Sequence, residues 1–447
     1  MNRTLFHILF IYIIFSSSVF ADPIERFPKP DFESGYERPI LQTPDARHVG
    51  LDYLDLFVLV AALSLASYFA LKKRSRRHIF VLMVFSLIYF GFWRKGCICS
   101  IGAIQNVVHA LFSNSYAIPI VAVAFFVFPL IFTLFFGRTF CAAVCPLGAV
   151  QDVVVLKPIS LPGWLNQTLS VLPYIYLGLS VLFAATGTGY LICRYDPFVG
   201  FFRFGASFNM ILFGAFMLLL GTVVARPYCR FLCPYGVLLN WMSRLSQKHL
   251  SITPSECINC RLCEASCPFD AINKPIEGKS YEPREKSTRR LALLLVLAPV
   301  VVVASGWVGS LLYVPLSKAH YTVALAEEIK LEDTGKRTET TDETDAFRAT
   351  GKSTVELYAE AREVQRQFKI GGWFLGGFLG LLFCVKLINL SVFRKQDIYE
   401  ADRGNCYSCG RCFEYCPVGV DGISKAEVEN EAKAENKAKA EAKAKIE

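Results

Sequence analysis

Long apolar runs constrain this chain more than any other feature of its sequence. Runs near the roughly 20 residues needed to cross a bilayer occur at 53–71, 79–93, 116–136, 168–192, 206–225, 291–315 and 371–393. With 53% hydrophobic residues, the chain is also too apolar for an ordinary soluble protein. We therefore predict an all-α polytopic membrane protein with about seven transmembrane helices in the mature chain, arranged in part as pseudo-repeated helix pairs.

Basic residues at the ends of these runs predict the orientation. The clusters "KKRSRR" (72–77), "REKSTRR" (284–290) and "FRK" (393–395) all fall on one side of a seven-span arrangement. The positive-inside rule makes this side the cytoplasm, so we expect a bacterial inner-membrane protein. The net charge of +9 then reflects membrane orientation, and nucleic acid is not an expected partner.

Two cysteine runs carry the strongest chemical signal. "CINCRLCEASCP" and "CYSCGRCFEYCP" both have the spacing C-x2-C-x2-C-x3-C-P, which is typical of bacterial ferredoxins that bind [4Fe–4S] clusters. Three cysteines at every third position can hold three corners of a cubane, and the next turn holds the fourth apart. Two identical runs make a zinc site a negligible alternative. The predicted ligands are Cys257, Cys260, Cys263, Cys267, Cys406, Cys409, Cys412 and Cys416.

Both runs fall on the predicted cytoplasmic face, although two membrane spans and an external loop separate them. In two-cluster ferredoxins the fourth cysteine of each run binds the other cluster. We therefore predict one small ferredoxin-like α+β domain with two [4Fe–4S] clusters, assembled from two distant segments. One cluster would use Cys257, Cys260, Cys263 and Cys416, and the other would use Cys406, Cys409, Cys412 and Cys267.

The predicted organisation of the whole chain follows. The start, "MNRTLFHILFIYIIFSSSVFADP", has the form of a signal peptide, with an uncleaved anchor as the alternative. The predicted segments are 1–21 signal peptide or N-terminal anchor, 22–50 periplasmic arm, 51–245 membrane domain with repeated Cys-Pro-Gly motifs, 246–288 first ferredoxin segment, 289–315 transmembrane helix, 316–369 periplasmic loop, 370–394 transmembrane helix, 395–424 second ferredoxin segment and 425–447 charged tail.

A second cysteine phrase recurs beside the apolar runs. It reads "RTFCAAVCPLGAVQD" at 138–152, "RPYCRFLCPYGVLLN" at 226–240 and, in a shortened copy, "RKGCICSIGAIQN" at 94–106. Each copy has an arginine three residues before its first cysteine and a glycine three residues after its last. A related phrase, "CRYDPFVG", begins at Cys193.

These membrane cysteines suggest further metal ligation. We predict an inner group, formed by Cys141, Cys145, Cys229 and Cys233, and an outer group, formed by Cys97, Cys99 and Cys193 with the help of Asp196. They would hold one or two additional membrane-embedded iron–sulfur clusters, whose negative charge Arg94, Arg138 and Arg226 would offset. The alternatives are that the cysteines only pack as small buried side chains, or that the outer ones form a disulfide. Cys384 is expected to pack, and His78, His109 and His320, which could ligate haem b or contact quinone, are assigned no role.

Taken together, these motifs resemble the NapH/NosR-type membrane polyferredoxins over roughly residues 50–420. The resemblance implies electron transfer between the quinone pool or a cytoplasmic donor and a periplasmic reductase system. NosR-type proteins also carry an external domain with covalently bound FMN, whereas this chain has no S/T-G-A-[ST] flavinylation phrase. A flavin is therefore expected only on a separate partner subunit.

The function that we expect is that of a membrane-bound iron–sulfur electron-transfer protein in a respiratory complex. It would connect a quinol or cytoplasmic-side donor to a periplasmic flavoprotein or cytochrome. A stand-alone catalyst is not expected, because the clusters carry the redox chemistry. The alternatives are a polyferredoxin assembly factor, which would reduce a metal or thiol during maturation of a respiratory metalloenzyme, and a membrane redox sensor.

Overall fold

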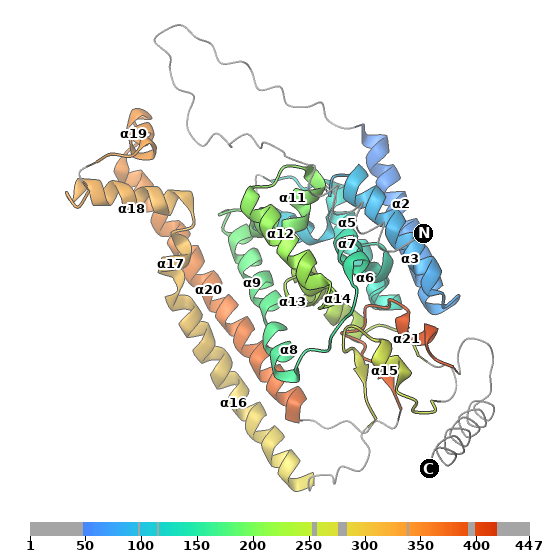
Figure 1. Ribbon diagram of the computed structural model, residues 1–447. Helices are drawn as coiled ribbons and strands as arrows, with labels where there is room; N and C mark the ends of the chain where they lie inside the picture. Colours follow the sequence, from blue (N-terminus) through green and yellow to red (C-terminus); the bar gives the residue numbers. More distant parts are fainter. Residues whose placement is uncertain are drawn as a thin grey trace, which may run out of the picture.

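The computed structural model describes residues 48–96, 99–113, 116–252, 257–275, 284–337, 339–391 and 398–417. This part of the chain is mostly helical and contains a two-stranded sheet (Figure 1). The predicted signal peptide or anchor, most of the periplasmic arm, the charged tail and Cys97 lie outside the described residues.

Within these residues, five helices are long and apolar enough to cross a membrane. They are α2 (Val49–Leu71), α3 with the π-helix η1 (Arg76–Ser86, Leu87–Trp93), α8 with α9 (Gly163–Leu169, Leu172–Ala185), α16 (Arg284–Leu311) and α20 (Thr354–Ser391). A sixth span results if α11 (Pro197–Arg203) and α12 (Phe208–Gly221), bent by 112° at their junction, count as one. The chain is a multi-pass membrane protein.

Two of the seven predicted spans form shorter helices than expected. The run at 116–136 becomes α5 (Ile120–Phe136, 17 residues), and the run at 206–225 becomes α12, with 14 residues. At about 1.5 Å per residue these helices cover only ~25 and ~21 Å of a hydrocarbon core of about 30 Å. Both end where a long copy of the cysteine phrase begins: α5 at Gly137, which has φ 75°, and α12 shortly before Arg226, which has φ 49°.

The two long copies of the cysteine phrase have the same local structure. Each forms a five-residue helix and then a longer one: α6 (Thr139–Ala143) and α7 (Pro146–Val154), then α13 (Pro227–Phe231) and α14 (Pro234–Arg244). The first cysteine lies on the short helix, and the second precedes a proline that opens the longer helix. Proline is tolerated there because the first helical N–H has no intrahelical partner.

The shortened phrases repeat part of this pattern. Cys99 is the residue that precedes α4 (Ser100–Phe112), as Cys145 precedes α7. Asp196 precedes Pro197 at the start of α11, as Cys233 precedes Pro234 at the start of α14. The membrane domain therefore contains four helix starts of related sequence.

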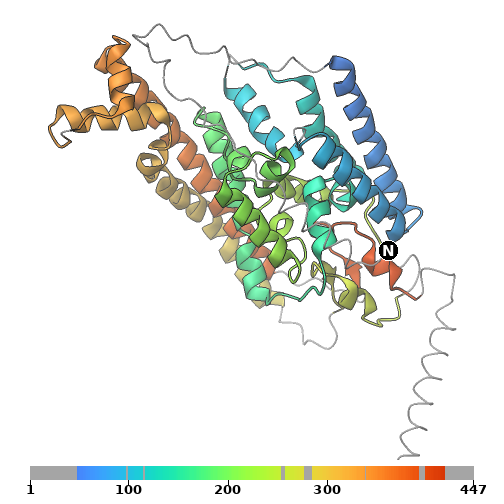
Figure 2. The same ribbon diagram turned by 45° about the horizontal axis from the view of Figure 1, so that its top comes forward.

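The two ferredoxin segments pair with each other. Strand β1 (Ile272–Asn273) is antiparallel to β2 (Glu400–Ala401), with Ile272 opposite Ala401. Helices α15 (Leu262–Ser266) and α21 (Arg411–Glu414) lie beside them at the same end of the molecule (Figure 1, Figure 2). The pairing of β1 with β2 joins segments more than 120 residues apart in the sequence.

Helices α16 and α20 form a long pair that connects the two ferredoxin segments. Glycines allow their backbones to touch: a Cβ atom at Gly376 would lie only 2.1 Å from the Ser305 carbonyl oxygen. Small residues at such contacts are typical of packed membrane helices. The predicted loop at 316–369 is helical, with α17 (Tyr313–Ser317), α18 (Tyr321–Asp333) and α19 (Asp342–Ala349) at the end opposite α15 and α21 (Figure 1).

Candidate functional site

The eight ferredoxin cysteines lie together, and their neighbours mix the two runs. Cys263 interacts electrostatically with Cys257, Cys260 and Cys416. Cys406 interacts with Cys409 and Cys267, and Cys412 has Cys406, Cys409 and Cys267 as its first three thiol neighbours. Cys416 therefore lies near Cys263 of the first run, and Cys267 lies near Cys406, Cys409 and Cys412 of the second.

Burial strongly affects the acidity of these thiols. Burial, with neighbouring thiols acting in the same direction, raises the pKa of Cys406 to about 12 and the pKa of Cys263 to about 11. A thiol with such a pKa remains protonated at neutral pH unless a positively charged group binds it, and metal binding releases its proton. A metal that binds these buried cysteines must therefore displace their protons.

The inner group lies in the membrane domain where the two long cysteine phrases meet. Cys233 interacts electrostatically with Cys229, Cys145 and Cys141, so the structure brings all four predicted inner cysteines together. The glycine of each phrase leaves room for the other phrase. A Cβ atom at Gly148 would lie 3.3 Å from Nη1 of Arg226, and one at Gly236 would lie 3.4 Å from Nη2 of Arg138. Each repeated glycine thus lies against the arginine of the other repeat.

The three arginines of the phrases have different partners. Arg138 lies beside the inner cysteines, with Nη2 3.9 Å from Cys141 Sγ. Arg226 donates to the Cys141 carbonyl oxygen and is fully buried. Arg94 instead forms an ion pair with Asp55 at 2.8 Å. Arg138 is therefore placed to offset charge at the inner group, whereas Arg94 pairs with Asp55 and Arg226 also pairs with Asp152.

A glutamine that the sequence interpretation did not single out also contacts the inner group. Gln151 donates through Nε2 to Cys229 Sγ at 3.2 Å, and its Oε1 accepts from the backbone N–H of Tyr228 at 3.0 Å. Hydrogen bonds to ligand sulfur raise the reduction potential of an iron–sulfur site. The signal was available, because "GAVQD" and "GAIQN" place a glutamine six residues after Cys145 and Cys99.

One residue links the ferredoxin unit directly to the inner group. Tyr407 follows Cys406 in the chain, and its hydroxyl donates to the backbone carbonyl of Cys229 at 3.1 Å. The Arg138 guanidinium lies 4.2 Å from the centre of the Tyr407 ring, and Phe269 packs against the same ring at 4.7 Å. Tyr407 therefore forms a direct contact between the two cysteine systems.

Asp152 anchors the same interface. Its fully buried carboxylate forms ion pairs with Arg76 at 2.6 Å and with Arg226 and Arg411 at 3.3 Å. Burial would raise the pKa of Asp152, but the three guanidinium groups hold it well below its usual range. Because Arg411 lies between Cys409 and Cys412 in the second run, this carboxylate ties that run to the membrane domain.

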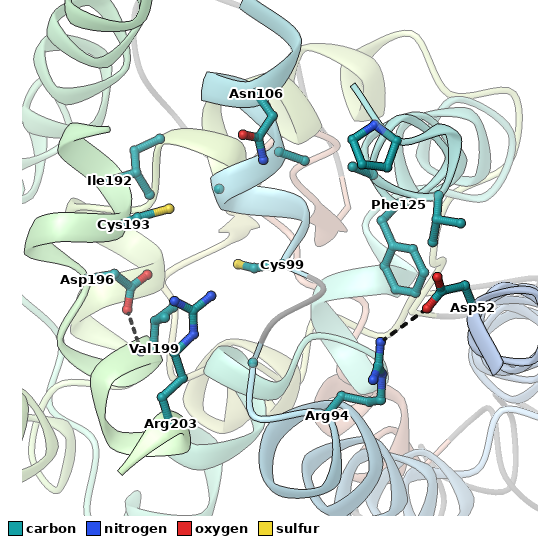
Figure 3. A pocket seen from close by; sticks show the side chains of 16 residues that line it. Asp52, Arg94, Cys99, Asn106, Phe125, Ile192, Cys193, Asp196, Val199 and Arg203 are labelled. Carbon is teal, nitrogen blue, oxygen red and sulfur yellow. Dashed lines mark hydrogen bonds and ion pairs between the residues drawn. The ribbon is translucent and has the colours of Figure 1, made fainter. Parts of the chain in front are cut away.

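The outer cysteines line a cavity of about 220 Å³ (Figure 3). Cys99 and Cys193 extend into it from α4 and α10 (Leu191–Tyr195). Asp196 is not available as a simple ligand, because Oδ1 accepts from the Phe198 N–H at 2.9 Å and Oδ2 accepts from the Tyr228 hydroxyl at 2.7 Å.

The prediction placed the outer and inner groups on opposite faces of the membrane. In the structure the two groups lie closer together than that. Cys99 and Cys145 line one small cavity of about 20 Å³. The reason is that the helices of the cysteine phrases begin inside the membrane domain rather than at its surfaces. The cysteine phrases therefore converge.

The described residues were also compared with the requirements of a site for a single metal ion. Among the residues that the structure describes, no three Cys, His, Asp or Glu side chains are close enough to hold one metal ion. A [4Fe–4S] cluster binds each cysteine through a different iron atom, so its ligands lie further apart.

The remaining candidates have ordinary partners. His78 contacts Ser75 Oγ and Lys73 Nζ, each at 2.8 Å. Nδ1 of His320 accepts from the Thr322 N–H, and Nδ1 of His109 lies 3.2 Å from the Ala184 carbonyl oxygen. Cys384 is buried on α20. Each of these four side chains is placed by local packing or capping.

Comparisons with family models bear on both cysteine systems. A model described as a 4Fe-4S binding domain matches residues 118–162 and 206–253, and another with the same description matches 250–273. The first two matches contain the two long cysteine phrases, and the third contains the first ferredoxin run. No solved structure is a significant match.

Several curated proteins are similar over part of the chain. The chain is 25% identical to the regulatory protein NosR of Stutzerimonas stutzeri, over 43% of this chain and 29% of that protein. It is 25% identical to the putative electron transport protein YccM of Escherichia coli, over 34% of this chain and 48% of that protein. It is 28% identical to the methylamine utilization ferredoxin-type protein MauN of Paracoccus denitrificans, over 33% of this chain and 53% of that protein.

The chain covers less than two thirds of the length of each of these three relatives. Over the matched part, the predicted resemblance to NosR-type membrane polyferredoxins is confirmed. The chain is a multi-pass membrane protein that contains matches to 4Fe-4S binding domains.

Proposed function

We propose that this protein carries single electrons through the inner membrane as a subunit of a respiratory complex. The ferredoxin unit would lie in the cytoplasm and receive electrons from a quinol or a cytoplasmic-side donor. A periplasmic flavoprotein or cytochrome would accept them on the opposite side, and any flavin would be on that separate subunit. The contact of Tyr407 with the Cys229 carbonyl carries this proposal, because it joins the ferredoxin cysteines to those in the membrane.

Three clusters fit the donor sets. Two [4Fe–4S] clusters would be held by the exchanged ferredoxin cysteines in a small α+β domain, and a third would be held by Cys141, Cys145, Cys229 and Cys233. When bound, these clusters supply reversible single-electron transfer. A membrane carrier needs such intermediate sites, because the hydrocarbon core of about 30 Å is too wide for one efficient step.

The chain's own residues tune and protect the inner site. Gln151 donates a hydrogen bond to Cys229 Sγ, and Arg138 places positive charge beside Cys141. Both interactions favour added negative charge at the site and so raise its reduction potential. Cys145 and Cys233 are buried, which limits access of water and oxygen to the sulfur ligands.

The test uses full-length protein reconstituted in vesicles. The variant Cys141→Ser/Cys229→Ser should lose about four of about 12 iron atoms per chain, while the signals of the ferredoxin clusters remain. Electrons from an impermeant reductant on the ferredoxin side should no longer reach an acceptor on the opposite side. Cys384→Ser, which removes a buried cysteine outside both groups, is the matched control and should change neither measurement.

The result that contradicts the proposal is equally specific. If the double variant retains both its iron and its transmembrane electron transfer, the inner cysteines only pack between helices. A Gln151→Leu variant separates a structural effect from a redox effect, because the inner site should keep its iron while its reduction potential falls. Unchanged potentials in Gln151→Leu would contradict the assigned contact with the sulfur ligand.

A further inference from the structure

A cavity of about 380 Å³ lies between the inner group and the ferredoxin unit. Cys229 and Cys233 of the inner group form part of its wall, and Tyr407 of the ferredoxin unit forms another part. Further wall residues come from α8, α13, α14 and the last turns of α20, at the end of the molecule where α15 and α21 lie (Figure 1). The volume falls in the range of about 300–1,000 Å³ that is usual for small-molecule sites.

Positive charge dominates this cavity. Among the described residues, four basic side chains line it, whereas Asp270 is the one acidic side chain that does so. Asp270 is already paired with Arg230, at 2.8 Å. The other three basic residues, for which the described part of the chain provides no ion pair with a carboxylate, are Arg138, Arg244 and Lys386. We name this site the basic cavity.

Neutral groups hold two of these basic side chains in place. Lys386 Nζ donates to Ser170 Oγ at 2.7 Å, which joins α20 to the end of α8. Arg244 Nε donates to Asn240 Oδ1 at 2.9 Å, within α14. Neutral acceptors fix the position of a cation but do not cancel its charge. The basic cavity therefore keeps an excess of positive charge on side chains that are already oriented.

The inner cysteines account for only part of this charge. Arg138 lies 3.9 Å from Cys141 Sγ and is placed to offset charge there. Arg244 and Lys386 form no hydrogen bond with a cysteine in the described part of the chain. The basic residues also extend from the interior to the surface, because Arg138 is only 4% exposed whereas Arg244 is exposed. This gradient gives a charged ligand a path into the cavity from outside.

We propose that the basic cavity binds the phosphate group of a small phosphate ester or of an anionic phospholipid. Guanidinium groups match the geometry of phosphate oxygens, and the ammonium group of Lys386 adds a compact charge. A phosphate group has enough acceptor oxygens to contact several of these donors at once, whereas a carboxylate has two. Because the site lies at the ends of the membrane helices α8 and α20, both soluble esters and lipid headgroups can reach it.

Binding of phosphate has a consequence for the inner group. Cys229 and Cys233 line the same cavity, so a bound phosphate places negative charge beside them. Negative charge disfavours the addition of an electron, and it should therefore lower the reduction potential of a cluster held there. This consequence rests on the proposed function, whereas phosphate binding itself does not.

The test uses the full-length protein, purified in a detergent without phosphate groups. Calorimetric titration with inorganic phosphate should show one site per chain if the ligand is a soluble ester. Native mass spectrometry should show retention of phosphatidylglycerol in preference to phosphatidylcholine if the ligand is an anionic lipid. The variant Arg244→Gln/Lys386→Gln should weaken binding at least about tenfold, because charge-assisted hydrogen bonds are lost. The control Lys330→Gln/Arg362→Gln makes the same change in charge on exposed residues far from the cavity and should bind like the wild type.

Each alternative result has a distinct meaning. If the wild type neither binds inorganic phosphate nor prefers phosphatidylglycerol, the inference is wrong, whatever the folding of the cavity variant. Equal weakening in the two double variants would also overturn it, because the effect would then come from net charge alone. If phosphate binds and the reduction potential of the inner site stays unchanged, the phosphate site stands and a cluster beside Cys229 and Cys233 is contradicted. If Cys141→Ser/Cys229→Ser loses iron and no phosphate binds, only this inference fails.

Discussion

Replacing Asp152 by asparagine should separate the ferredoxin unit from the membrane domain. The carboxylate is fully buried and neutralises Arg76, Arg226 and Arg411, which come from three distant segments. At an effective dielectric constant of about 20, a charge pair at 3.3 Å is worth about 5 kcal/mol before desolvation is subtracted. Removing one partner of a buried pair costs about 3–5 kcal/mol, because the remaining charge stays buried. We expect Asp152→Asn to be destabilised by about this amount.

Thermal unfolding in detergent measures the effect. For a cooperative unit of 150–250 residues, a loss of 3–5 kcal/mol lowers the midpoint by roughly 6–20 °C. Combining Asp152→Asn with Arg411→Gln should cost less than the sum of the two single changes, because both remove the same ion pair. Glu363→Gln removes an exposed ion pair with Arg366 and is the control, with no measurable shift expected. An unchanged midpoint for Asp152→Asn, or strictly additive effects, would refute the reasoning.

The pH dependence follows from the same carboxylate. Because the pKa of Asp152 is lower in the folded protein than in the unfolded chain, its contribution to stability is fully present above about pH 4. That contribution is lost as the pH falls through the lower folded-state pKa. The wild type should therefore lose stability relative to Asp152→Asn below about pH 4, whereas the difference between the two proteins should be constant from pH 5 to pH 7.

Three further predictions concern the assembly. Cys416→Ser should remove the cluster of the first run rather than that of its own, so its EPR spectrum should differ from that of Cys409→Ser; identical spectra would show ligation within each run. Gly376→Leu should destabilise the α16–α20 pair by about 1–3 kcal/mol or more, because its Cβ atom would lie 2.1 Å from a backbone oxygen, whereas Gly163→Leu meets no neighbour within 4 Å and should unfold at the wild-type temperature. A cysteine introduced at Thr340 should react with an impermeant reagent outside intact cells, and protection there would reverse the predicted topology.

Sequence patterns predicted the parts of this protein that depend on local spacing. The two ferredoxin runs were recognisable because a cluster requires cysteines at fixed intervals, and Cys416 of the second run lies near Cys263 of the first. The exchange of ligands between the runs stays a prediction. The apolar runs identified the membrane helices for the same reason. The lengths of these helices were less predictable, because α5 and α12 end at breaks in the helical backbone that hydropathy does not predict.

The ion pairs and hydrogen bonds between distant segments were not accessible from the sequence. Asp152 is an unremarkable acidic residue in the phrase, and only the fold reveals that three arginines converge on it. The predicted separation of the outer and inner cysteines rested on hydropathy, which assigns each helix end to a face. Cys99 and Cys145 share a cavity because their helices start within the membrane domain. Gln105 and Gln151 were visible in the sequence as a repeat. The sequence does not show that Gln151 Nε2 donates to Cys229 Sγ, whereas Gln105 Nε2 has no hydrogen-bond partner among the described residues.

The pairing of β1 with β2 has a consequence for biosynthesis. The first run ends at Cys267 and the second at Cys416, so a ribosome must add about 150 residues, including both helices of the α16–α20 pair, before the exchanged ligands exist. At about 5–20 residues per second this takes roughly 8–30 seconds. During that interval the first three cysteines of the early run are exposed to metal ions and oxidants. With exchanged ligands, neither cluster could obtain its complete set of cysteines before Cys416 is synthesised, so cluster loading would report that both helices of the α16–α20 pair are complete.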